Sequence, residues 1–414
     1  MLLALQPGCG TVPTVPNTQY QATVGRVAVI TTPAEPAIDF SVITRGKTEG
    51  AARGAGSTFL SCVGAFGPGG CSGEFCGPVI ILWLGVCGVA GAAGGIAGAV
   101  AAPGTDTAKS SRHTLSTALN ISTIQASLRN LTEAAALAGG VSLVPLPAAS
   151  TRIPGDYRPL ADAEVNTLLE VTLTGADMTG AGINEPTGLR MQAHVRVIRT
   201  RDNSVIFSTD YVYMGEKLKP TKWSANRSAR LLAGLETGYK TLGTHIIENT
   251  FLLYPFPDRQ PHASGFLSSA FGLAPVYPPT RGQLTDEPLI GNRFEWTSVD
   301  TLRPTLRWQG FPRPTDIEAA REEMGRITNV RYDLVIAREQ NLAPAGIVYR
   351  REGLLATRHT IETSLSPATR YFWTVRARFE LDGRERVTEW GSTHFMARER
   401  WTAPSHLSYR FKTP

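Results

Sequence analysis

The sequence predicts an α+β domain, in which helices cover one face of a mixed or antiparallel sheet, followed by an all-β sandwich. Three patterns indicate this: period-two alternation in residues 165–213, apolar residues at helical spacing on either side of it, and short β-rich runs beyond residue 290. The first domain is interrupted by a glycine-rich stretch from Gly54 to Thr105, in which Glu74 is the only formal charge. We expect this insertion to form a helical hairpin.

The α+β domain is expected to span residues 23–254. Residues 24–30 and 141–146 are rich in β-branched or apolar side chains, and each predicts a short strand. Between them a helix is predicted from Ser110 to the Gly139–Gly140 pair by one apolar series: Leu115, Leu119, Ile124, Leu128, Leu131 and Ala135. Three antiparallel strands follow, and then a second long helix with its own stripe: Leu231, Leu235, Tyr239, Leu242 and Ile246.

This order of elements resembles the small N-terminal periplasmic domain of TolB and the related core of the curli-secretion lipoprotein CsgG. The resemblance covers about residues 24–254 and rests on element order and composition. It implies a periplasmic domain and, through CsgG, an alternative function in secretion.

The C-terminal part is expected to be all β. Residues 255–290 are rich in Pro, Gly and Ser and predict a linker. Residues 291–400 carry short strands at the spacing of a sandwich, and residues 401–414 are expected to be a tail. An acidic, helix-like stretch at residues 316–326 separates two of the early strands.

One motif in this part is specific. Leu365, Pro367, Thr369 and Tyr371 match the L-x-P-x-T-x-Y run of fibronectin type III domains, which residues 295–397 resemble. The resemblance implies that the Tyr371 hydroxyl reaches back to loop backbone as a tyrosine corner. It also implies a sandwich that presents a binding surface.

The insertion, at about residues 46–104, is long and apolar enough to reach lipid. Residues 79–102 are uncharged, and about 20 such residues cross a bilayer as a helix. Glycines at three- and four-residue spacing allow two helices to approach closely: Gly50, Gly54, Gly85, Gly88, Gly91, Gly94, Gly95 and Gly98. We predict a hairpin that inserts into membrane lipid; the alternatives are a soluble helical pair buried against a partner protein and a disordered loop.

Four of the five cysteines lie in the insertion, and their even number is compatible with two disulfides: Cys62, Cys71, Cys76 and Cys87. Disulfides indicate an oxidising compartment such as the periplasm. The alternative is four inert buried thiols. Zinc is disfavoured because Cys71 and Cys76 are too widely spaced and no His lies nearby.

Residues 1–22 are expected to be a lipoprotein signal remnant and a flexible tether. The apolar run before Gly8 and Cys9 resembles the end of a bacterial lipoprotein signal, which implies lipidation of Cys9. The run departs from that pattern at Gln6, where an apolar residue is usual, and it lacks a basic segment in front. A true start upstream of Met1 would account for the second departure.

The sequence contains no motif of a familiar catalytic or cofactor site. The seven His residues are scattered, and His194 is expected on the solvated face of a strand. The net charge is +6, but Lys and Arg form no block that would follow a phosphate backbone. We therefore expect no catalytic residue, no cofactor, no metal and no nucleic-acid partner.

These patterns predict a non-enzymatic bacterial envelope lipoprotein that scaffolds or assembles a multiprotein complex. The expected partners are membrane lipid, other envelope proteins and further copies of this chain, in a homo-oligomer or a hetero-complex. The expected location is the outer membrane, facing the periplasm. The alternatives are a subunit of an oligomeric secretion or transport channel and a glycan-binding envelope protein.

Overall fold

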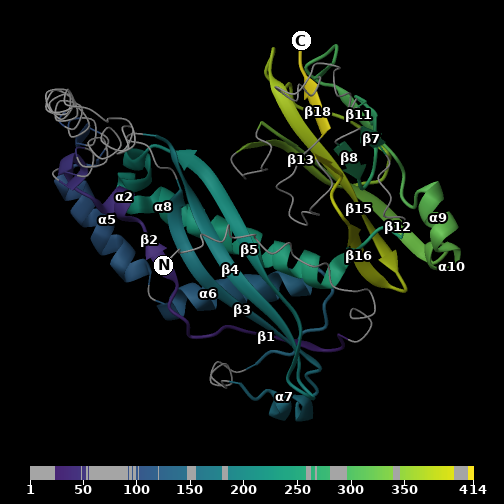
Figure 1. The fold of residues 1–414 in the computed structure, drawn as a ribbon, viewed down its shortest axis with the longest axis horizontal. Coiled ribbons are helices and arrows are strands. Elements are labelled where there is room, and N and C mark those ends of the chain that lie inside the picture. The colour runs from purple at the N-terminus through teal and green to yellow at the C-terminus, as the bar shows by residue number, and fades with distance from the viewer. Residues whose placement is uncertain are drawn as a thin grey trace, which may run out of the picture.

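The chain forms an α+β domain followed by a β-rich domain (Figure 1). The computed structural model describes residues 24–47, 49–52, 102–119, 121–146, 155–179, 185–257, 263–265, 268–279, 296–338, 346–395 and 409–414, with isolated positions at 55, 92, 96 and 99–100. In these residues the predicted order of the two parts is confirmed.

The α+β domain is built on a five-stranded mixed sheet. Three long antiparallel strands pair in chain order: β3 (Thr167–Thr179), β4 (Thr187–Arg199) and β5 (Ser204–Leu218). On the other side of β3, β1 (Val27–Ile30) and β2 (Ala37–Asp39) pair with it in parallel at successive positions. β5 is therefore an edge of the sheet, and β4 is the only described strand that pairs with it.

The alternation predicted for these strands places one set of side chains in the core. Val171 of β3 lies opposite Val195 of β4, which lies opposite Thr209 of β5. The inward residues of β3 and β4 are buried: Leu169, Val171, Leu173, Leu189, Met191, Ala193, Val195 and Val197. Because successive side chains of a strand point to opposite faces, the same strands carry polar residues on the other face.

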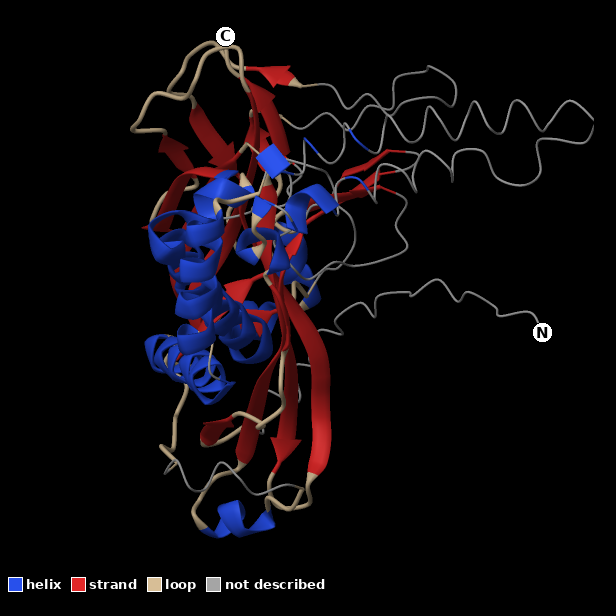
Figure 2. Ribbon diagram, turned by 90° about the vertical axis from the view of Figure 1, so that its left-hand side faces the viewer, coloured by secondary structure: helices blue, strands red, loops and turns tan. Residues whose placement is uncertain are grey.

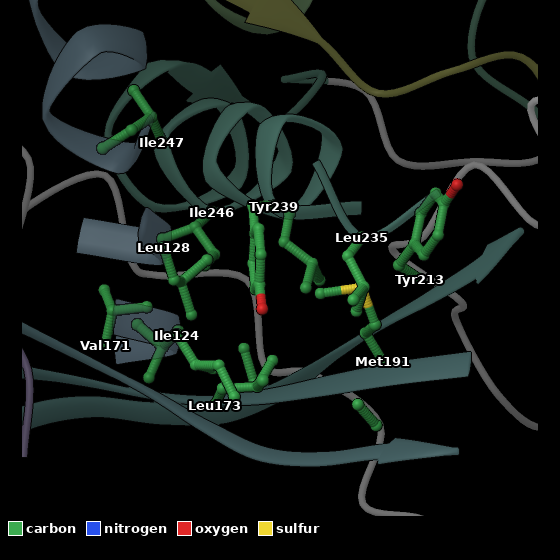
Figure 3. Close-up of a cluster of buried hydrophobic side chains, with 14 of the residues drawn as sticks. Ile124, Leu128, Val171, Leu173, Met191, Tyr213, Leu235, Tyr239, Ile246 and Ile247 are labelled. Atoms are coloured by element: carbon green, nitrogen blue, oxygen red, sulfur yellow. The ribbon is translucent and has the colours of Figure 1, made fainter. Parts of the chain in front are cut away.

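Helices cover the apolar face of this sheet (Figure 2). They are α2 (Ser41–Thr44), α5 (Thr105–Ala118), α6 (Ile121–Ala138) and α8 (Pro220–Ile247), which continues into a π-helical turn, η2 (Glu248–Leu252). Figure 3 shows Tyr239 of α8 pointing toward the sheet, with Leu128 of α6 beside it and Leu173 of β3 below. A short helix, α7 (Arg158–Asp162), packs over a smaller apolar cluster that includes Leu168.

Two predicted elements differ from the structure. The single helix predicted from residue 110 is divided into α5 and α6. The strand predicted at residues 141–146 is reduced to one bridge between Leu143 and Val27. Two backbone bonds hold that bridge, from the Val27 N–H to the Ser142 carbonyl and from the Val144 N–H to the Val27 carbonyl, both 2.8 Å long. Pro145 has no N–H with which to extend the pairing.

Helices α6 and α8 lie close together at Gly243. A Cβ atom there would lie 3.0 Å from the backbone of Leu131 and Thr132, so only glycine fits without moving one helix. Elsewhere the two helices leave a groove of about 400 Å³, lined in part by Leu119, Leu235 and Tyr239.

Residues 225–228 interrupt α8 with a strained turn. Asn226, Arg227 and Ser228 have φ of 51°, 54° and 61°, which lies in the left-handed region. A residue with a side chain is disfavoured there by about 1–2 kcal/mol. Just before the turn the chain is anchored by Trp223, whose indole N–H donates to the Thr187 carbonyl at 2.8 Å.

We expect Arg227→Gly to stabilise the protein by about 1 kcal/mol, because glycine relieves the left-handed strain at a small cost in unfolded-state entropy. Arg230→Gly, three residues later in regular helix, should instead destabilise by about 1 kcal/mol. Both arginines are exposed, so neither variant loses buried contacts. The free energies of unfolding, measured by urea titration, therefore report the effect of backbone conformation. Shifts of the same sign would contradict a left-handed turn.

The β-rich domain contains a larger sheet and a smaller sheet that share one core, and a further three-stranded sheet. The larger sheet has the order β10-β18-β15-β12-β13: β10 (Thr297–Ser298), β18 (Tyr409–Lys412), β15 (Arg370–Leu381), β12 (Ile327–Ala337) and β13 (Ile347–Leu354). The smaller sheet lies across the core and has the order β14-β11-β9: β14 (Arg358–Thr360), β11 (Thr305–Trp308) and β9 (Pro275–Tyr277). A third sheet comprises β17 (Ser392–Phe395), β8 (Ser268–Phe271) and β7 (Ala263–Gly265). The predicted acidic helical stretch corresponds to α9 (Pro314–Ala319) and α10 (Arg321–Met324).

Two segments predicted to be a linker and a tail supply strands of the β-rich domain. The predicted linker supplies β7, β8 and β9, and Leu273 is fully buried in the core. The predicted tail supplies β18, where Tyr409 and Phe411 alternate inward and are also fully buried. The linker prediction was wrong for these residues because Pro and Gly are frequent in turns between short strands as well as in linkers.

Candidate functional site

Most of the predicted site residues lie outside the described residues. This holds for Cys9, for the four insertion cysteines Cys62, Cys71, Cys76 and Cys87, and for the glycines Gly54, Gly85, Gly88, Gly91, Gly94, Gly95 and Gly98. Gly50 is described; it is helical, and its N–H donates to the Gly46 carbonyl at 2.9 Å. Lipidation, disulfides and the glycine-ridged hairpin remain predictions.

The two ends of the insertion lie side by side, at what we call the insertion corner. A Cβ atom built on Gly46 would lie 3.8 Å from the Thr105 hydroxyl, although 59 positions separate them in sequence numbering. Arg112 of α5 holds the corner, because its Nη2 donates to the Thr44 carbonyl at 3.0 Å and lies 3.5 Å from the Glu49 carboxylate. The residues on either side of segment 47–101 therefore lie close together.

Apolar side chains are exposed just before the chain returns to this corner. Ile96 and Val100 are 70% and 69% exposed, and Ala92 is exposed as well. Each of these three positions is helical, and they follow one another at four-residue spacing. Among the described residues, no helix has the length and apolarity needed to span a membrane.

The predicted tyrosine-corner residues come together around the turn before β15. The Tyr371 hydroxyl accepts a hydrogen bond from the Ser366 N–H at 2.9 Å, and Leu365 is buried beside it in the core. The Thr369 N–H donates to the hydroxyl of Thr413 at 2.9 Å. Pro367 is exposed. Identification of the domain as fibronectin type III remains a prediction.

The sheet face opposite the helices, which we call the open face, carries paired polar side chains. Arg190 donates to the Asp177 carboxylate at 3.2 Å and to the Gln192 side chain at 3.0 Å. Arg196 donates to Glu170 at 3.3 Å. Asp177 and Glu170 lie on β3, next to the arginines of β4, so these ion pairs help to fix the register of the sheet and leave little free charge.

Three open-face residues have the connectivity of a catalytic triad. His194 Nδ1 lies 2.8 Å from the Asp210 carboxylate, and His194 Nε2 lies 3.2 Å from the Ser208 hydroxyl. An acyl-transfer site also needs donors aimed at a developing oxyanion. The N–H groups of paired strands lie in the sheet plane, and Arg196, opposite Ser208, is bound to Glu170. The three residues are therefore better interpreted as a cross-strand hydrogen-bond chain.

A small polar pocket of about 230 Å³ lies at the end of the open face. At its wall the buried Glu170 carboxylate accepts hydrogen bonds from the Tyr157 hydroxyl at 2.9 Å and from Arg196. Burial, with the negative charge of Glu170, raises the pKa of Tyr157 to about 12, so its hydroxyl remains a donor. Both carboxylate oxygens are thus already bound within the protein.

Sequence reasoning placed His194 on the solvated face correctly but did not find its partners. The signal was present: the alternation of β5 puts Ser208 and Asp210 on the same face as His194 once the hairpin turn at Asp202–Asn203 sets the register. Within the described part of the chain, no three His, Cys, Asp or Glu residues are grouped as metal ligands would be.

No family model matches the chain, and no curated protein matches it. Solved structures that match part of the chain include the PelC dodecamer from Paraburkholderia phytofirmans, at 13% identity over 30% of this chain and 74% of that one, with a TM-score of 0.22. Lipoprotein GNA1162 from Neisseria meningitidis matches at 14% identity over 26% and 82%, with a TM-score of 0.18. Protein XCC0632 of family DUF330 from Xanthomonas campestris matches at 12% identity over 57% and 90%, with a TM-score of 0.21. Scores this low carry no argument about function.

Proposed function

We propose that the chain is a non-enzymatic, membrane-associated envelope lipoprotein that serves as a scaffold or assembly component of an oligomeric complex. Lipid of the outer membrane, reached from the periplasm through Cys9 and the inserted hairpin, would anchor it. Other envelope proteins or further copies of the chain would bind the folded domains.

The observation that carries this proposal is the insertion corner. An apolar segment that leaves and returns at one point can extend away from the domain without disturbing its core. Ile96 and Val100, which precede the corner in the sequence, are largely exposed apolar side chains. In water, exposed apolar surface of this kind costs free energy unless lipid or protein covers it.

Two further features support an assembly role. The edge of β5 has no described strand partner, and Val205 and Val212 on that strand are both 47% exposed. An edge strand without a partner is open to pairing with another chain. The strand orders of the seven-stranded sheet and of the β14-β11-β9 sheet, with Tyr371 at the start of β15, support a fibronectin type III-like binding domain.

Deleting residues 47–101 tests the anchor. The deletion joins Gly46 to Ala102, and residues 102–104 can then span the short gap to Thr105. We expect the shortened protein, carrying Cys9→Ser, to keep both folded domains by circular dichroism and to be lost from the membrane fraction. The matched control is Cys9→Ser with the insertion intact, which should stay with membranes in high salt and carbonate.

Release of that control by carbonate would reject lipid insertion. The size of the detergent-extracted complex then separates the functions: a ring of fixed stoichiometry that conducts ions in planar bilayers favours the channel alternative. Retention on peptidoglycan without release of soluble fragments favours the glycan-binding alternative. A monomer would reject both the scaffold and the channel.

A further inference from the structure

The outer face of the larger sheet in the β-rich domain, which points away from the shared core, changes in character along β15. Two further strands complete this seven-stranded sheet: β16 (Arg384–Thr388) and β6 (Leu253–Tyr254). On the half of the face beside β16 the arginines of β15 are neutralised within the protein. Arg376 donates to Glu248 at 2.9 Å, and Arg378 donates to Asp333 at 3.3 Å.

The other half of this face, beside β18, gathers cations and aromatic rings, and we call it the cation face: Trp296, Arg370, Phe372, Arg410 and Lys412. Across β15 and β18, Phe372 lies opposite Arg410 and Arg370 lies opposite Lys412. Trp296 comes directly before β10, which pairs with β18. Tyr371 and Phe411 alternate with these residues and are buried in the core, so the neighbouring side chains stand on the outer face.

The aromatic rings of the cation face hold its guanidinium groups. The Trp296 ring centroid lies 5.3 Å from the Arg370 guanidinium carbon and 5.7 Å from that of Arg410. The Arg410 guanidinium also lies 5.4 Å from the Phe372 ring, which meets the Trp296 ring edge-on. At such distances the ring quadrupole attracts the cation. Because guanidinium donors lie in the plane of the group, contact through its flat side leaves N–H groups at its edge for an oxyanion.

Arg370 and Lys412 leave the cation face positively charged. Both are exposed, and in the part of the chain that the structure describes no carboxylate forms an ion pair with either, including Asp300 just after β10. Exposed arginines elsewhere in this domain do have carboxylate partners: Arg326–Asp382, Arg350–Glu352 and Arg351–Glu362. The cation face therefore presents charge that an anion from outside the chain can neutralise.

We propose that the cation face binds an acidic polysaccharide. Carboxylate groups of the glycan pair with Arg370 and Lys412, and its sugar rings lie on the exposed parts of Trp296 and Phe372. This inference depends neither on the membrane anchor nor on the assembly role of the chain.

The placement of these side chains favours a glycan over the two other anionic partners. An interfacial membrane anchor buries its apolar side chains about 5–10 Å into the lipid, whereas Trp296 and Phe372 are only partly exposed on a sheet face. An acidic peptide that adds to a sheet pairs through the backbone at an edge strand, whereas these cations project from the face. A glycan chain can lie across the face, with C–H groups on the electron-rich ring faces and carboxylates at the guanidinium edge.

Binding is tested on the full-length protein in neutral detergent by calorimetric titration with alginate oligosaccharides, which carry a carboxylate on each sugar. We expect alginate to bind more weakly as salt is raised, and dextran, a neutral glucan, not to bind. Arg370→Ala and Lys412→Ala should each weaken binding by up to about fivefold, as expected for an exposed ion pair, and the double variant by more. Trp296→Leu, which removes the ring but no charge, should weaken binding at every salt concentration.

Arg326→Ala is the control, because this exposed arginine already pairs with Asp382 and its loss should leave alginate binding unchanged. Three results would overturn the proposal: no binding of alginate, a double variant that binds as the wild type does, or stronger binding of competing polyglutamate or dihexanoyl-phosphatidylglycerol than of alginate. The last would identify an acidic peptide or an anionic lipid as the partner. Since Arg370 and Lys412 are exposed, their variants should fold even if Trp296→Leu does not.

Discussion

Replacing Phe411 with alanine is expected to destabilise the β-rich domain by about 3–5 kcal/mol, the range for truncating a fully buried Phe. Phe411 lies on β18 and stacks on Tyr371 with the ring centroids 5.6 Å apart. Because whole domains are stable by only about 5–15 kcal/mol, such a loss removes a large part of the stability of this domain. Urea unfolding followed by near-ultraviolet circular dichroism measures it.

Deletion of residues 409–414 should have a larger effect still, because it removes a whole strand from the larger sheet. It also removes Thr413, whose hydroxyl donates to the Ser366 carbonyl at 2.7 Å in the turn before β15. Lys412→Ala is the control, since Lys412 is an exposed neighbour on the same strand and should change stability by less than about 0.5 kcal/mol. An unchanged unfolding transition in the deletion would mean that these residues are a tail after all.

Asp316→Ala is expected to cost about 3–5 kcal/mol, the typical loss when one partner of a buried ion pair is removed. Asp316 is fully buried at the start of α9, and its carboxylate accepts hydrogen bonds from Arg313 at 2.7 and 2.8 Å. Arg313 also donates to the Gly272 carbonyl at 3.3 Å and lies 4.2 Å from the Phe256 ring. The pair therefore ties α9 to residues that the sequence had suggested were linker.

The surface pair Arg326–Asp382 provides the matched comparison for Asp316. Its side chains are about half exposed, so Asp382→Ala should cost no more than about 1 kcal/mol. Replacing the buried pair together, Arg313→Met with Asp316→Leu, should recover most of the loss because no unpaired charge remains. If Asp316→Ala and Asp382→Ala proved equally mild in urea unfolding, the buried pair would not hold α9 in place.

Local patterns were enough to predict β1, the three long antiparallel strands and α8 of the α+β domain. The inward set of β4, for instance, follows directly from the alternation of Leu189 with Arg190 and Met191 with Gln192. The division between α5 and α6 was missed, since an apolar stripe continues across a break in the backbone. The role of β18 was missed because Tyr409 and Phe411 are only two inward residues, and a run this short gives little periodicity.

The surfaces were harder to predict than the elements. Glu248 and Arg376 are 128 positions apart, and nothing in either local sequence indicates that they meet. The adjacency of Gly46 and Thr105 is likewise a property of the packed helices, not of the glycine-rich sequence between them. Such contacts depend on tertiary packing, which patterns confined to one element do not record.

The shared exit and return point of residues 47–101 also bears on how this protein can change over evolutionary time. None of the described strand pairings passes through that segment. Its length and composition can therefore drift, or the segment can be exchanged for another, while the sheet keeps its register. Changes in the segment can therefore be selected for what the segment contacts, without affecting how the sheet folds. Related chains should differ most in length between the positions equivalent to Gly46 and Thr105.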